Sequence, residues 1–278
     1  MKNSVKNMPF VKMHGLGNDY IYVDCFVPQT AALISKTNLS SLAQRVSDRH
    51  FGIGSDGLVL ILPSKEADAK MRIFNADGSE AQMCGNAIRC VGKYLYESGL
   101  CPRPRLFIET LAGIKTLSLQ VQEGIVSQIS VNMGTPKVTT DSLALQGNDL
   151  LGFTSVNMGN PHAVFFRVQN LLDAEITKMG HPISTHPHFP AGTNVELVHV
   201  RNAHELEVRV YERGSGPTLA CGTGACAAAV AAYKHGETEE EMTVHLPGGD
   251  LLIHYDHRTN MVTMTGPATE VFRGEMAL

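Results

Sequence analysis

Two stretches of this sequence share one pattern: Phe74-Asn-Ala-Asp-Gly-Ser-Glu-Ala-Gln-Met-Cys84-Gly-Asn and Tyr211-Glu-Arg-Gly-Ser-Gly-Pro-Thr-Leu-Ala-Cys221-Gly-Thr. In both, an aromatic residue lies ten positions before a cysteine, and Gly with a small polar residue follows the cysteine. An apolar stretch typical of a buried helix comes next. The pattern predicts two similar halves, each with one cysteine at the beginning of a helix.

The match continues outward from the two cysteines. A Gly-Asn pair precedes each cysteine, and Gly residues follow in the same order downstream in each half. Any one of these landmarks could mark an ordinary turn, but their shared order predicts an internal duplication. The further landmarks are Gly17-Asn18 and Gly159-Asn160, Gly113 and Gly248, and Gly134-Thr-Pro136 and Gly266-Pro267.

Short β-rich runs separated by turn residues dominate both halves, which predicts mostly antiparallel strands. A helix is expected after each key cysteine, ending near Gly99 and Gly236. Each half should therefore be a curled, mostly antiparallel sheet or barrel around a central helix, and the fold class is α+β. The expected strands are 20–24, 58–62, 71–74, 106–110, 114–119 and 125–131, then 155–156, 163–168, 195–200, 206–211, 242–246 and 250–255; outer helices are expected at 39–46 and 171–179.

The composition indicates a packed protein with room for two domains. Hydrophobic residues make up 43% and charged residues 18% of the 278 residues. The net charge of −4 and the lack of a basic run exclude a nucleic-acid footprint. The longest apolar run, 225–233, is too short to span a bilayer, and the start has no signal-peptide stretch. We therefore expect a cytoplasmic protein with no nucleic-acid or membrane partner.

The six cysteines are expected to be reduced thiols. A chain of this size needs no disulfide framework, and the close pairs Cys84/Cys90 and Cys221/Cys226 lack the two-residue spacing of zinc sites. The Gly-Ile-Gly-Ser-Asp-Gly segment at 52–57 lacks the spacing and context of a dinucleotide fingerprint. No metal or cofactor is predicted. The expected inert, buried cysteines are Cys25, Cys90, Cys101 and Cys226.

The positions of Cys84 and Cys221 suggest acid–base chemistry. Free N–H groups and the dipole at a helix start favour negative charge, so a thiol there should ionise more easily than usual. The same N–H groups can bind a substrate carboxylate. If a thiolate removes an α-proton from one face of a carbon and a thiol returns one to the other face, the configuration inverts. The sequence thus predicts a cofactor-independent amino-acid racemase or epimerase.

Eight segments, in order along nearly the whole chain, match those of a known family: Met13–Asp19, Gly52–Gly57, Arg72–Glu80, Cys84–Asn86, Asn157–His162, Val210–Gly214, Ala220–Gly224 and Leu246–Gly249. In these segments the sequence resembles diaminopimelate epimerase. The resemblance implies an isomerase that converts LL-2,6-diaminoheptanedioate into the meso form, in lysine and peptidoglycan precursor synthesis. It implies two pseudo-twofold domains with the active site in the cleft between them, and a homodimer. The family's C-terminal tail returns to the first domain, so we assign 1–130 with 268–278 to the first domain and 131–267 to the second.

The resemblance also implies roles for individual residues. Cys84 and Cys221 would be the catalytic acid–base pair, with His162 and Glu212 tuning the thiols. The substrate has two carboxylates and two ammonium groups, so an Arg could grip one carboxylate bidentately and Asn side chains could serve either group. The implied substrate-binding residues are Asn18, Asn75, Gly85, Asn86, Asn160, Asn194, Glu212, Arg213, Gly222 and Thr223.

One departure and several alternatives accompany this hypothesis. Gly57 stands where many relatives carry a glutamine that contacts substrate, so that contact is lost or supplied elsewhere. A proline or hydroxyproline racemase or epimerase shares the two-cysteine logic, but its substrate has no second charged end for Arg213. The chain could also be a non-catalytic amino-acid-binding module. A thiol redox protein is disfavoured because neither cysteine lies in a C-x-x-C motif.

Overall fold

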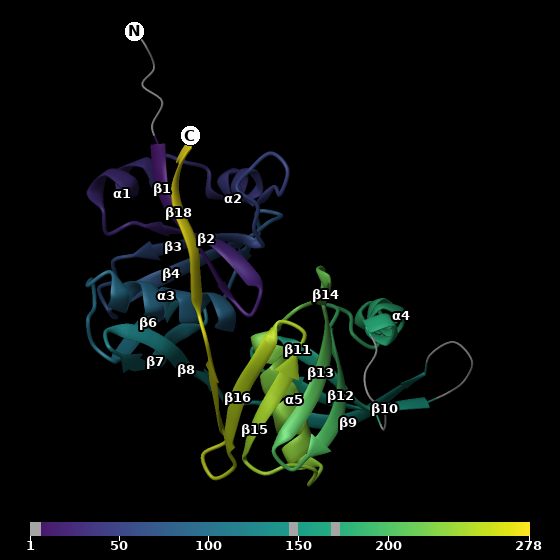
Figure 1. Cartoon of the computed structure of the whole chain (residues 1–278). Helices are drawn as coiled ribbons and strands as arrows, with labels where there is room; N and C mark the ends of the chain where they lie inside the picture. Colours follow the sequence, from purple (N-terminus) through teal and green to yellow (C-terminus); the bar gives the residue numbers. More distant parts are fainter. Residues whose placement is uncertain (1–6, 145–149, 168–172) are drawn as a thin grey trace. The chain divides into compact units, whose positions relative to one another are not determined.

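The computed structural model describes residues 7–144, 150–167 and 173–278, which divide into two compact units (Figure 1). One unit contains Met1–Val131 and Pro267–Leu278, and the other Asn132–Gly266. The expected division placed Val131 and Pro267 in the second half, whereas the structure groups both with the first unit. Strands with a few helices build both units, which confirms the expected α+β class.

In the first unit, the strands pair in the order β18–β1–β2–β3–β4–β6–β7–β8, and the short β5 also pairs with β4. The pairs β2/β3 and β4/β6 are parallel, and the other pairs are antiparallel. The elements are β1 Asn7–Gly15, β2 Asn18–Asp24, α1 Pro28–Ile34, α2 Leu39–Ser47, β3 Gly57–Leu62, β4 Ala69–Asn75, β5 Glu80–Ala81, α3 Gly85–Glu97, β6 Arg105–Thr110, β7 Gly113–Gln122, β8 Ile125–Gly134 and β18 Thr269–Ala277.

The second unit repeats this arrangement. Its strands pair in the order β9–β10–β11–β12–β13–β15–β16–β17, with β14 on β13, and β11/β12 and β13/β15 are the parallel pairs. The order and the strand directions match those of the first unit, which supports the internal duplication. The elements are β9 Lys137–Ala144, β10 Leu150–Asn157, β11 Pro161–Arg167, α4 Asp173–Ser184, β12 Asn194–Asn202, β13 Glu205–Glu212, β14 Gly216–Thr218, α5 Gly222–Lys234, β15 Glu241–Leu246, β16 Gly249–Asp256 and β17 Met261–Gly266.

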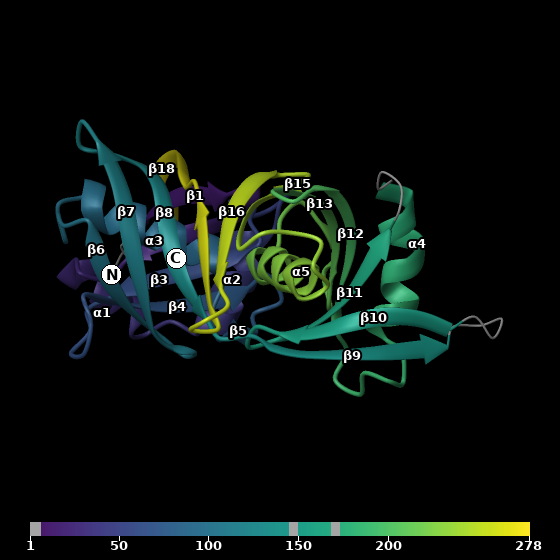
Figure 2. The same cartoon turned by 90° about the horizontal axis from the view of Figure 1, so that it is seen from below.

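A helix lies at the centre of each unit. In the first, α3 packs against β1, β2 and β7; in the second, α5 packs against β10–β13 and β15–β17. Figure 2 looks nearly along α5 and shows strands of the second unit around it. Nearly every residue of α5 is buried, and its alanines let the surrounding strands approach closely. Cys84 and Cys221 directly precede these central helices. The strands that pack around each helix therefore also fix the position of its cysteine.

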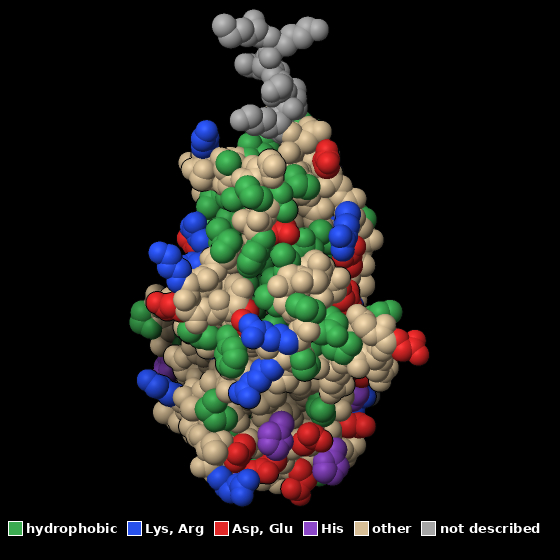
Figure 3. Space-filling view, turned by 90° about the vertical axis from the view of Figure 1, so that its left-hand side faces the viewer, with side chains coloured by type: hydrophobic (Ala, Val, Ile, Leu, Met, Phe, Trp, Pro, Cys, Tyr) green, Lys and Arg blue, Asp and Glu red, His purple; other side chains and the backbone are tan. Residues whose placement is uncertain are grey.

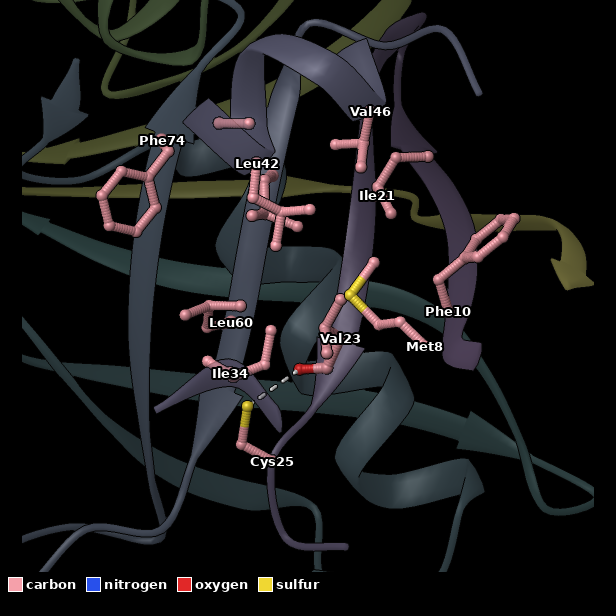
Figure 4. Packing of buried hydrophobic residues seen from close by; sticks show 12 residues of the cluster. Met8, Phe10, Ile21, Val23, Cys25, Ile34, Leu42, Val46, Leu60 and Phe74 are labelled. Carbon is pink, nitrogen blue, oxygen red and sulfur yellow. Dashed lines mark hydrogen bonds between the residues drawn. The ribbon is translucent and has the colours of Figure 1, made fainter. Parts of the chain in front are cut away.

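Shorter helices cover the outside of each sheet. In the first unit, Leu42 and Val46 of α2 and Ile34 of α1 pack on Ile21 and Leu60 of the sheet (Figure 4). In the second unit, α4 packs against β12 and β13. The Asn38 side chain accepts a hydrogen bond from Ser41 N and caps α2. The expected outer helix at 39–46 is therefore confirmed.

Two expectations about elements need correction. The helix expected at 171–179 is α4, which continues to Ser184; residues 171 and 172, and residue 168 of an expected strand, lie outside the described residues. α4 continues through Gly180, where a Cβ would come within 2.4 Å of the Tyr211 ring. The short helix α1 was not expected at all, because its Pro-Gln-Thr-Ala-Ala-Leu-Ile sequence carries little amphipathic pattern.

The surface carries charges of both signs. On the face in Figure 3, Lys and Arg side chains are interspersed with Asp and Glu side chains. None of the helices in the described parts of the chain is both long and apolar enough to span a membrane.

Candidate active site

Cys84 and Cys221 occupy the same position in the two units, immediately before the central helices. Each has an extended backbone, and each sulfur accepts a hydrogen bond from a backbone N–H one turn into the helix. The distances are 3.5 Å from Ala87 N to Cys84 Sγ and 3.4 Å from Gly224 N to Cys221 Sγ. The sulfurs thus cap the helices, which confirms the expected helix starts. Neither cysteine is in a disulfide.

In the first unit, Asn18 lies beside Cys84. A two-residue turn, with Leu16 at φ 56° and Gly17 at φ 82°, brings β1 round to β2 and places Asn18 at the first strand position. Cys84 Sγ donates to Asn18 Oδ1 at 3.4 Å, and Asn86 Nδ2 donates to the same oxygen at 3.4 Å. The structure therefore brings together three of the expected site residues.

Asn75 belongs to the same unit but has a different partner. It ends β4, and its Nδ2 donates to Ser79 Oγ at 3.0 Å within the following turn. Its strand partner is Gly57. A Cβ on Gly57 would lie 2.1 Å from Phe74 O and 2.9 Å from Tyr20 Cε1. The backbone and Tyr20 therefore fill the space into which a larger side chain at position 57 would begin to extend.

We expect Gly57→Gln to destabilise the protein rather than restore a substrate contact. The new Cβ would overlap a backbone oxygen, which cannot move without disturbing the β3/β4 pairing, so the free energy of unfolding should fall by about 3 kcal/mol. Urea unfolding monitored by circular dichroism checks this. Gly152→Ala serves as the control, because a Cβ at that strand position meets nothing within 4 Å. Unchanged stability in the Gly57→Gln variant would contradict the steric argument.

In the second unit, a chain of contacts leads from Cys221 into the core. Cys221 Sγ lies 3.5 Å from Thr223 Oγ1, and Asn160 Nδ2 donates to the same hydroxyl at 3.3 Å. Asn160 Oδ1 lies 3.1 Å from His162 Nε2, and His162 Nδ1 lies 2.6 Å from Glu196 Oε1. Since the Thr223 oxygen accepts from Asn160, its own proton is left to donate to the sulfur.

Glu212 is a carboxylate that contacts Cys221 directly. It ends β13, is hydrogen-bonded to the Cys221 thiol, and accepts from Thr218 Oγ1 at 2.6 Å. Burial raises the pKa of Glu212, and the Thr218 and His162 contacts only partly oppose that rise. A carboxyl group with a raised pKa next to a thiol is suited to exchange a proton with it.

The expected easier ionisation is wrong for Cys221 in the unliganded protein. Burial raises the pKa of this thiol well above its ordinary value, and the negative charges of Glu212 and Glu196 raise it further. The hydrogen bonds from Thr223 and Gly224 lower the pKa but do not compensate. At Cys221, the pKa-lowering effect of the helix start is therefore smaller than the pKa-raising effects of desolvation and of the two neighbouring carboxylates.

Glu196 is a site residue that the sequence reasoning missed. It is fully buried on β12, it bonds to His162, and its other oxygen, Oε2, has no hydrogen-bond partner among the described residues. A Cβ on Gly224 would lie 2.8 Å from its Oε1, so the carboxylate sits against the start of α5. The available signal was an acidic residue within the apolar strand segment Val195–Val200, because a buried acid needs a partner.

Glu196→Gln should make stability less dependent on pH. Burial raises the pKa of Glu196, so the folded state holds the proton more tightly than the unfolded chain does. The resulting stability is complete below the unfolded pKa of about 4.3 and is lost as the pH rises through the folded value. Free energies of unfolding at about pH 5 and about pH 8 should therefore differ less in the variant than in the wild type. Parallel profiles would contradict this expectation.

Asn194 and Arg213 are linked to each other. Asn194 Oδ1 accepts from Arg213 N at 2.9 Å, and Asn194 Nδ2 donates to Pro161 O at 3.0 Å, so this amide ties β11 to the end of β13. The exposed Arg213 guanidinium donates to Ala191 O at 2.9 Å. It lines an open pocket of about 470 Å³ together with Tyr211 and His181. A guanidinium with exposed donors can bind a carboxylate.

The remaining cysteines differ from the key pair. Burial raises the pKa of Cys25 to about 12 and that of Cys90 to about 11. Cys226 is fully buried on α5. Cys101 was expected to be buried but is partly exposed. Among residues 7–144, 150–167 and 173–278, no three His, Cys, Asp or Glu side chains form a group that could hold a metal ion.

Comparisons with known proteins agree with these features. The family model described as diaminopimelate epimerase matches residues 10–139 and 154–271. The diaminopimelate epimerase of Acetivibrio thermocellus is 50% identical over 98% of this chain and 99% of its own length. Those of Pelotomaculum thermopropionicum and Methanococcus maripaludis are 49% and 47% identical, over 96% and 97% of this chain and 98% and 99% of theirs.

Solved structures show the same fold at low identity. A hydroxyproline epimerase from Agrobacterium vitis matches with a TM-score of 0.73 at 17% identity, covering 100% of this chain and 94% of that one. A probable proline racemase from Agrobacterium radiobacter matches with a TM-score of 0.74 at 17% identity, covering 98% and 93%. The full-length sequence matches are far closer than these, and the chain therefore belongs to the diaminopimelate epimerase family.

Proposed function

We propose that this protein converts LL-diaminopimelate into meso-diaminopimelate without a cofactor, with Cys84 and Cys221 as its two acid–base groups. The observation that carries the proposal is the repeated placement of a thiol as the cap of a central helix, once in each unit. The choice of substrate is supported by relatives named diaminopimelate epimerase, which are 47–50% identical over nearly the full chain.

The proposed reaction is a proton exchange at one α-carbon. One sulfur, as thiolate, takes the α-proton and becomes a thiol, and the electron pair left behind is delocalised into the neighbouring carboxylate. The other sulfur, as thiol, gives its proton to the opposite face and becomes a thiolate. The carbon inverts, no atom is gained or lost, and the enzyme is left with the proton on the other cysteine. After product leaves, exchange of protons between the two sulfurs and solvent restores the starting state, and the reverse reaction restores it as well.

Backbone N–H groups at the helix starts would stabilise the charge that develops on the substrate carboxylate. Those of Gly85 and Asn86 begin α3, and those of Gly222 and Thr223 begin α5. Such groups have no partner within their helix and carry the positive end of its dipole. Because they are fixed before the reaction, they need no reorganisation when the charge forms.

Glu212 and Arg213 would divide two further tasks. The pKa of the Cys221 thiol is raised well above its ordinary value, so this thiol needs a base before it can act as a thiolate. Glu212, which is hydrogen-bonded to it, would accept that proton. Arg213 would bind the carboxylate at the end of the substrate that does not react. Binding energy from that end can orient the reacting carbon.

Incubation of the purified protein with LL-diaminopimelate in D2O, with no added cofactor, tests the function. We expect meso product with one deuterium at one α-carbon, detected by chiral chromatography and mass spectrometry. Treatment with a chelator and with a carbonyl reagent should leave the rate unchanged. Dependence on pyridoxal phosphate or a metal ion would contradict the cofactor-independent mechanism.

A proline or hydroxyproline racemase or epimerase is the second candidate, because solved structures with those titles share the fold. Parallel incubations with both amino acids in D2O discriminate the two. Deuterium in proline but not in diaminopimelate would replace the first proposal by the second. Binding of diaminopimelate with no exchange would indicate a non-catalytic binding module.

The homodimer and the cytoplasmic location remain predictions. Light scattering coupled to size-exclusion chromatography gives the oligomeric state, for which we expect about twice the mass of one chain. Cell fractionation gives the location.

A further inference from the structure

Asp56 contacts the amide of Asn18. It belongs to the 52–57 segment, and the proposed reaction gives it no role. Its Oδ2 accepts from Asn18 Nδ2 at 2.8 Å and from Asp19 N at 3.1 Å, and its Oδ1 accepts from Arg49 at 3.0 Å. A carboxylate offers acceptors only. The end of the Asn18 amide that faces Asp56 must therefore be the NH2 group.

The opposite end of this amide faces Cys84. With NH2 committed to Asp56, Asn18 Oδ1 lies 3.4 Å from Cys84 Sγ. An amide oxygen accepts a proton and cannot donate one, so it favours a sulfur that still carries its hydrogen. The reversed amide would present N–H to the sulfur and favour the thiolate. Asp56, without touching Cys84, thus favours one of two opposite environments for it, and Asn86 Nδ2, which donates to Asn18 Oδ1 at 3.4 Å, favours the same one.

We propose that Asp56 is a positioning residue that fixes the Asn18 amide with its oxygen toward Cys84, so that this cysteine is held as a thiol, the proton-donating form, in the unliganded protein. The consequence for catalysis rests on the proposed function. The arrangement itself concerns one thiol within one unit and is testable without substrate.

The surroundings of Asp56 hold it rigidly. Its backbone N donates to Asp19 O at 2.8 Å, and its carbonyl accepts from Ala76 N at 2.9 Å. Arg49 bridges the Asp19 and Asp56 carboxylates. The strand β2, the turn after β4 and the loop after α2 therefore all contact Asp56. These contacts limit how far its side chain can turn away from Asn18.

In the second unit, Asn160 is the equivalent of Asn18, and its amide has a different orientation. Tyr20 pairs with Gly57 in the first unit, and His162 pairs with Asn194 in the second, so Asp56 corresponds in position to Thr193. Asn160 has its oxygen on His162 and its NH2 toward Thr223. The two equivalent amides thus present opposite ends to their helix starts, and the duplication by itself does not explain Asp56.

Other groups around Cys84 also influence its proton. Tyr22 on β2 and Cys90 on α3 are close enough to Cys84 to interact with it electrostatically. Arg89, one turn into α3, donates to Gly85 O at 3.1 Å. The variants below leave all three unchanged, so differences in Cys84 between them come from the 18–56 contact or from the change in charge, which the control separates.

Asp56→Ala is the direct test. It removes the acceptor that holds the NH2 group of Asn18, which allows the Asn18 amide to turn and present N–H to Cys84. Asp56→Asn removes the charge but keeps an acceptor oxygen for Asn18 Nδ2 and Asp19 N, so it should leave the orientation of the Asn18 amide as it is. In Asp56→Ala we expect the pKa of the Cys84 thiol to fall, so that iodoacetamide alkylates it about fivefold faster at pH 7. Peptide mapping by mass spectrometry reads Cys84 separately, with the partly exposed Cys101 as internal reference. An unchanged or slower rate at Cys84 in Asp56→Ala overturns the proposal.

Asp19→Asn is the matched control. Asp19 belongs to the same ion-pair network, through Lys12 and Arg49, but its carboxylate makes no hydrogen bond to Asn18. We expect the rate at which iodoacetamide alkylates Cys84 to stay within twofold of wild type in this variant. An acceleration in Asp19→Asn or Asp56→Asn equal to that of Asp56→Ala would show that loss of a nearby negative charge explains the effect, and would overturn the proposal.

A double-mutant cycle shows whether Asp56 acts through Asn18. In an Asn18→Ala background, Asp56→Ala should leave the Cys84 alkylation rate unchanged, because no amide remains to be turned. Additive effects overturn the proposal. If Asp56→Ala does not fold, the side-chain NH2 signal of Asn18 in the wild-type NMR spectrum decides: a signal shifted by a carboxylate bond supports the proposal, and an ordinary solvent-exposed signal overturns it. None of these outcomes depends on epimerase activity.

Discussion

Alanine at Cys84 or at Cys221 is expected to abolish inversion of LL-diaminopimelate, with a rate loss of at least about a thousandfold. Each inversion needs a base on one face of the carbon and an acid on the other, so either variant lacks one partner. The remaining cysteine can still remove a proton from its own face and return deuterium to it. Slow exchange without inversion should therefore persist, for one stereoisomer in Cys84→Ala and for the other in Cys221→Ala.

Proton NMR in D2O with LL and meso substrate separates exchange from inversion in these variants. Cys101→Ala is the control, because Cys101 is a partly exposed thiol in the same unit as Cys84 and lies outside the helix starts. It should keep wild-type activity. Full epimerisation by either single variant of the key pair, or exchange of the same stereoisomer by both, would refute the two-base mechanism.

Glu212→Gln should lower kcat by about a hundredfold or more while KM changes little. Gln keeps the size of Glu and can still accept from Thr218, but it cannot take up the proton of Cys221. The negative charge of Glu212 also raises the pKa of that thiol, so its removal should make Cys221 easier to alkylate. A faster alkylation together with a slower reaction is a combination that structural damage alone does not produce.

Glu207→Gln provides the comparison for that variant. Glu207 is another largely buried carboxylate on β13, and it pairs with Arg201 and Arg209 instead of a thiol. We expect steady-state rates close to wild type. If both variants lose activity to the same extent, the loss reflects β13 as a whole and the proton-acceptor role of Glu212 fails.

The features that the sequence predicted correctly are local ones. A cysteine before Gly and an apolar run is enough to place a helix start, because capping and the apolar pattern act within a few residues. The repeated order of turns around Cys84 and Cys221 revealed the duplication for the same reason. The helix expected at 39–46 likewise follows from its capping Asn38 and its amphipathic pattern.

The features that escaped prediction depend on residues far apart in the chain. His162 and Glu196 meet across 34 positions, and Asn18 and Asp56 across 38. Their contacts follow from the parallel pairings β11/β12 and β2/β3, whose register is not visible in either strand alone. The raised pKa of Cys221 has the same origin, since desolvation depends on everything that packs around the sulfur.

The edge strands β9 and β18, which hold equivalent places in the two units, have a consequence for synthesis on the ribosome. β9 follows β8 directly and is the first strand of the second unit, whereas β18 is added to the first unit only after Gly266, by pairing along β1. The second unit can thus fold as soon as Gly266 has emerged. The first must wait for the last residues, with one edge of β1 open to other chains meanwhile. In limited proteolysis of stalled nascent chains ending near Gly266, we expect the second unit to resist cleavage while the first is still cut.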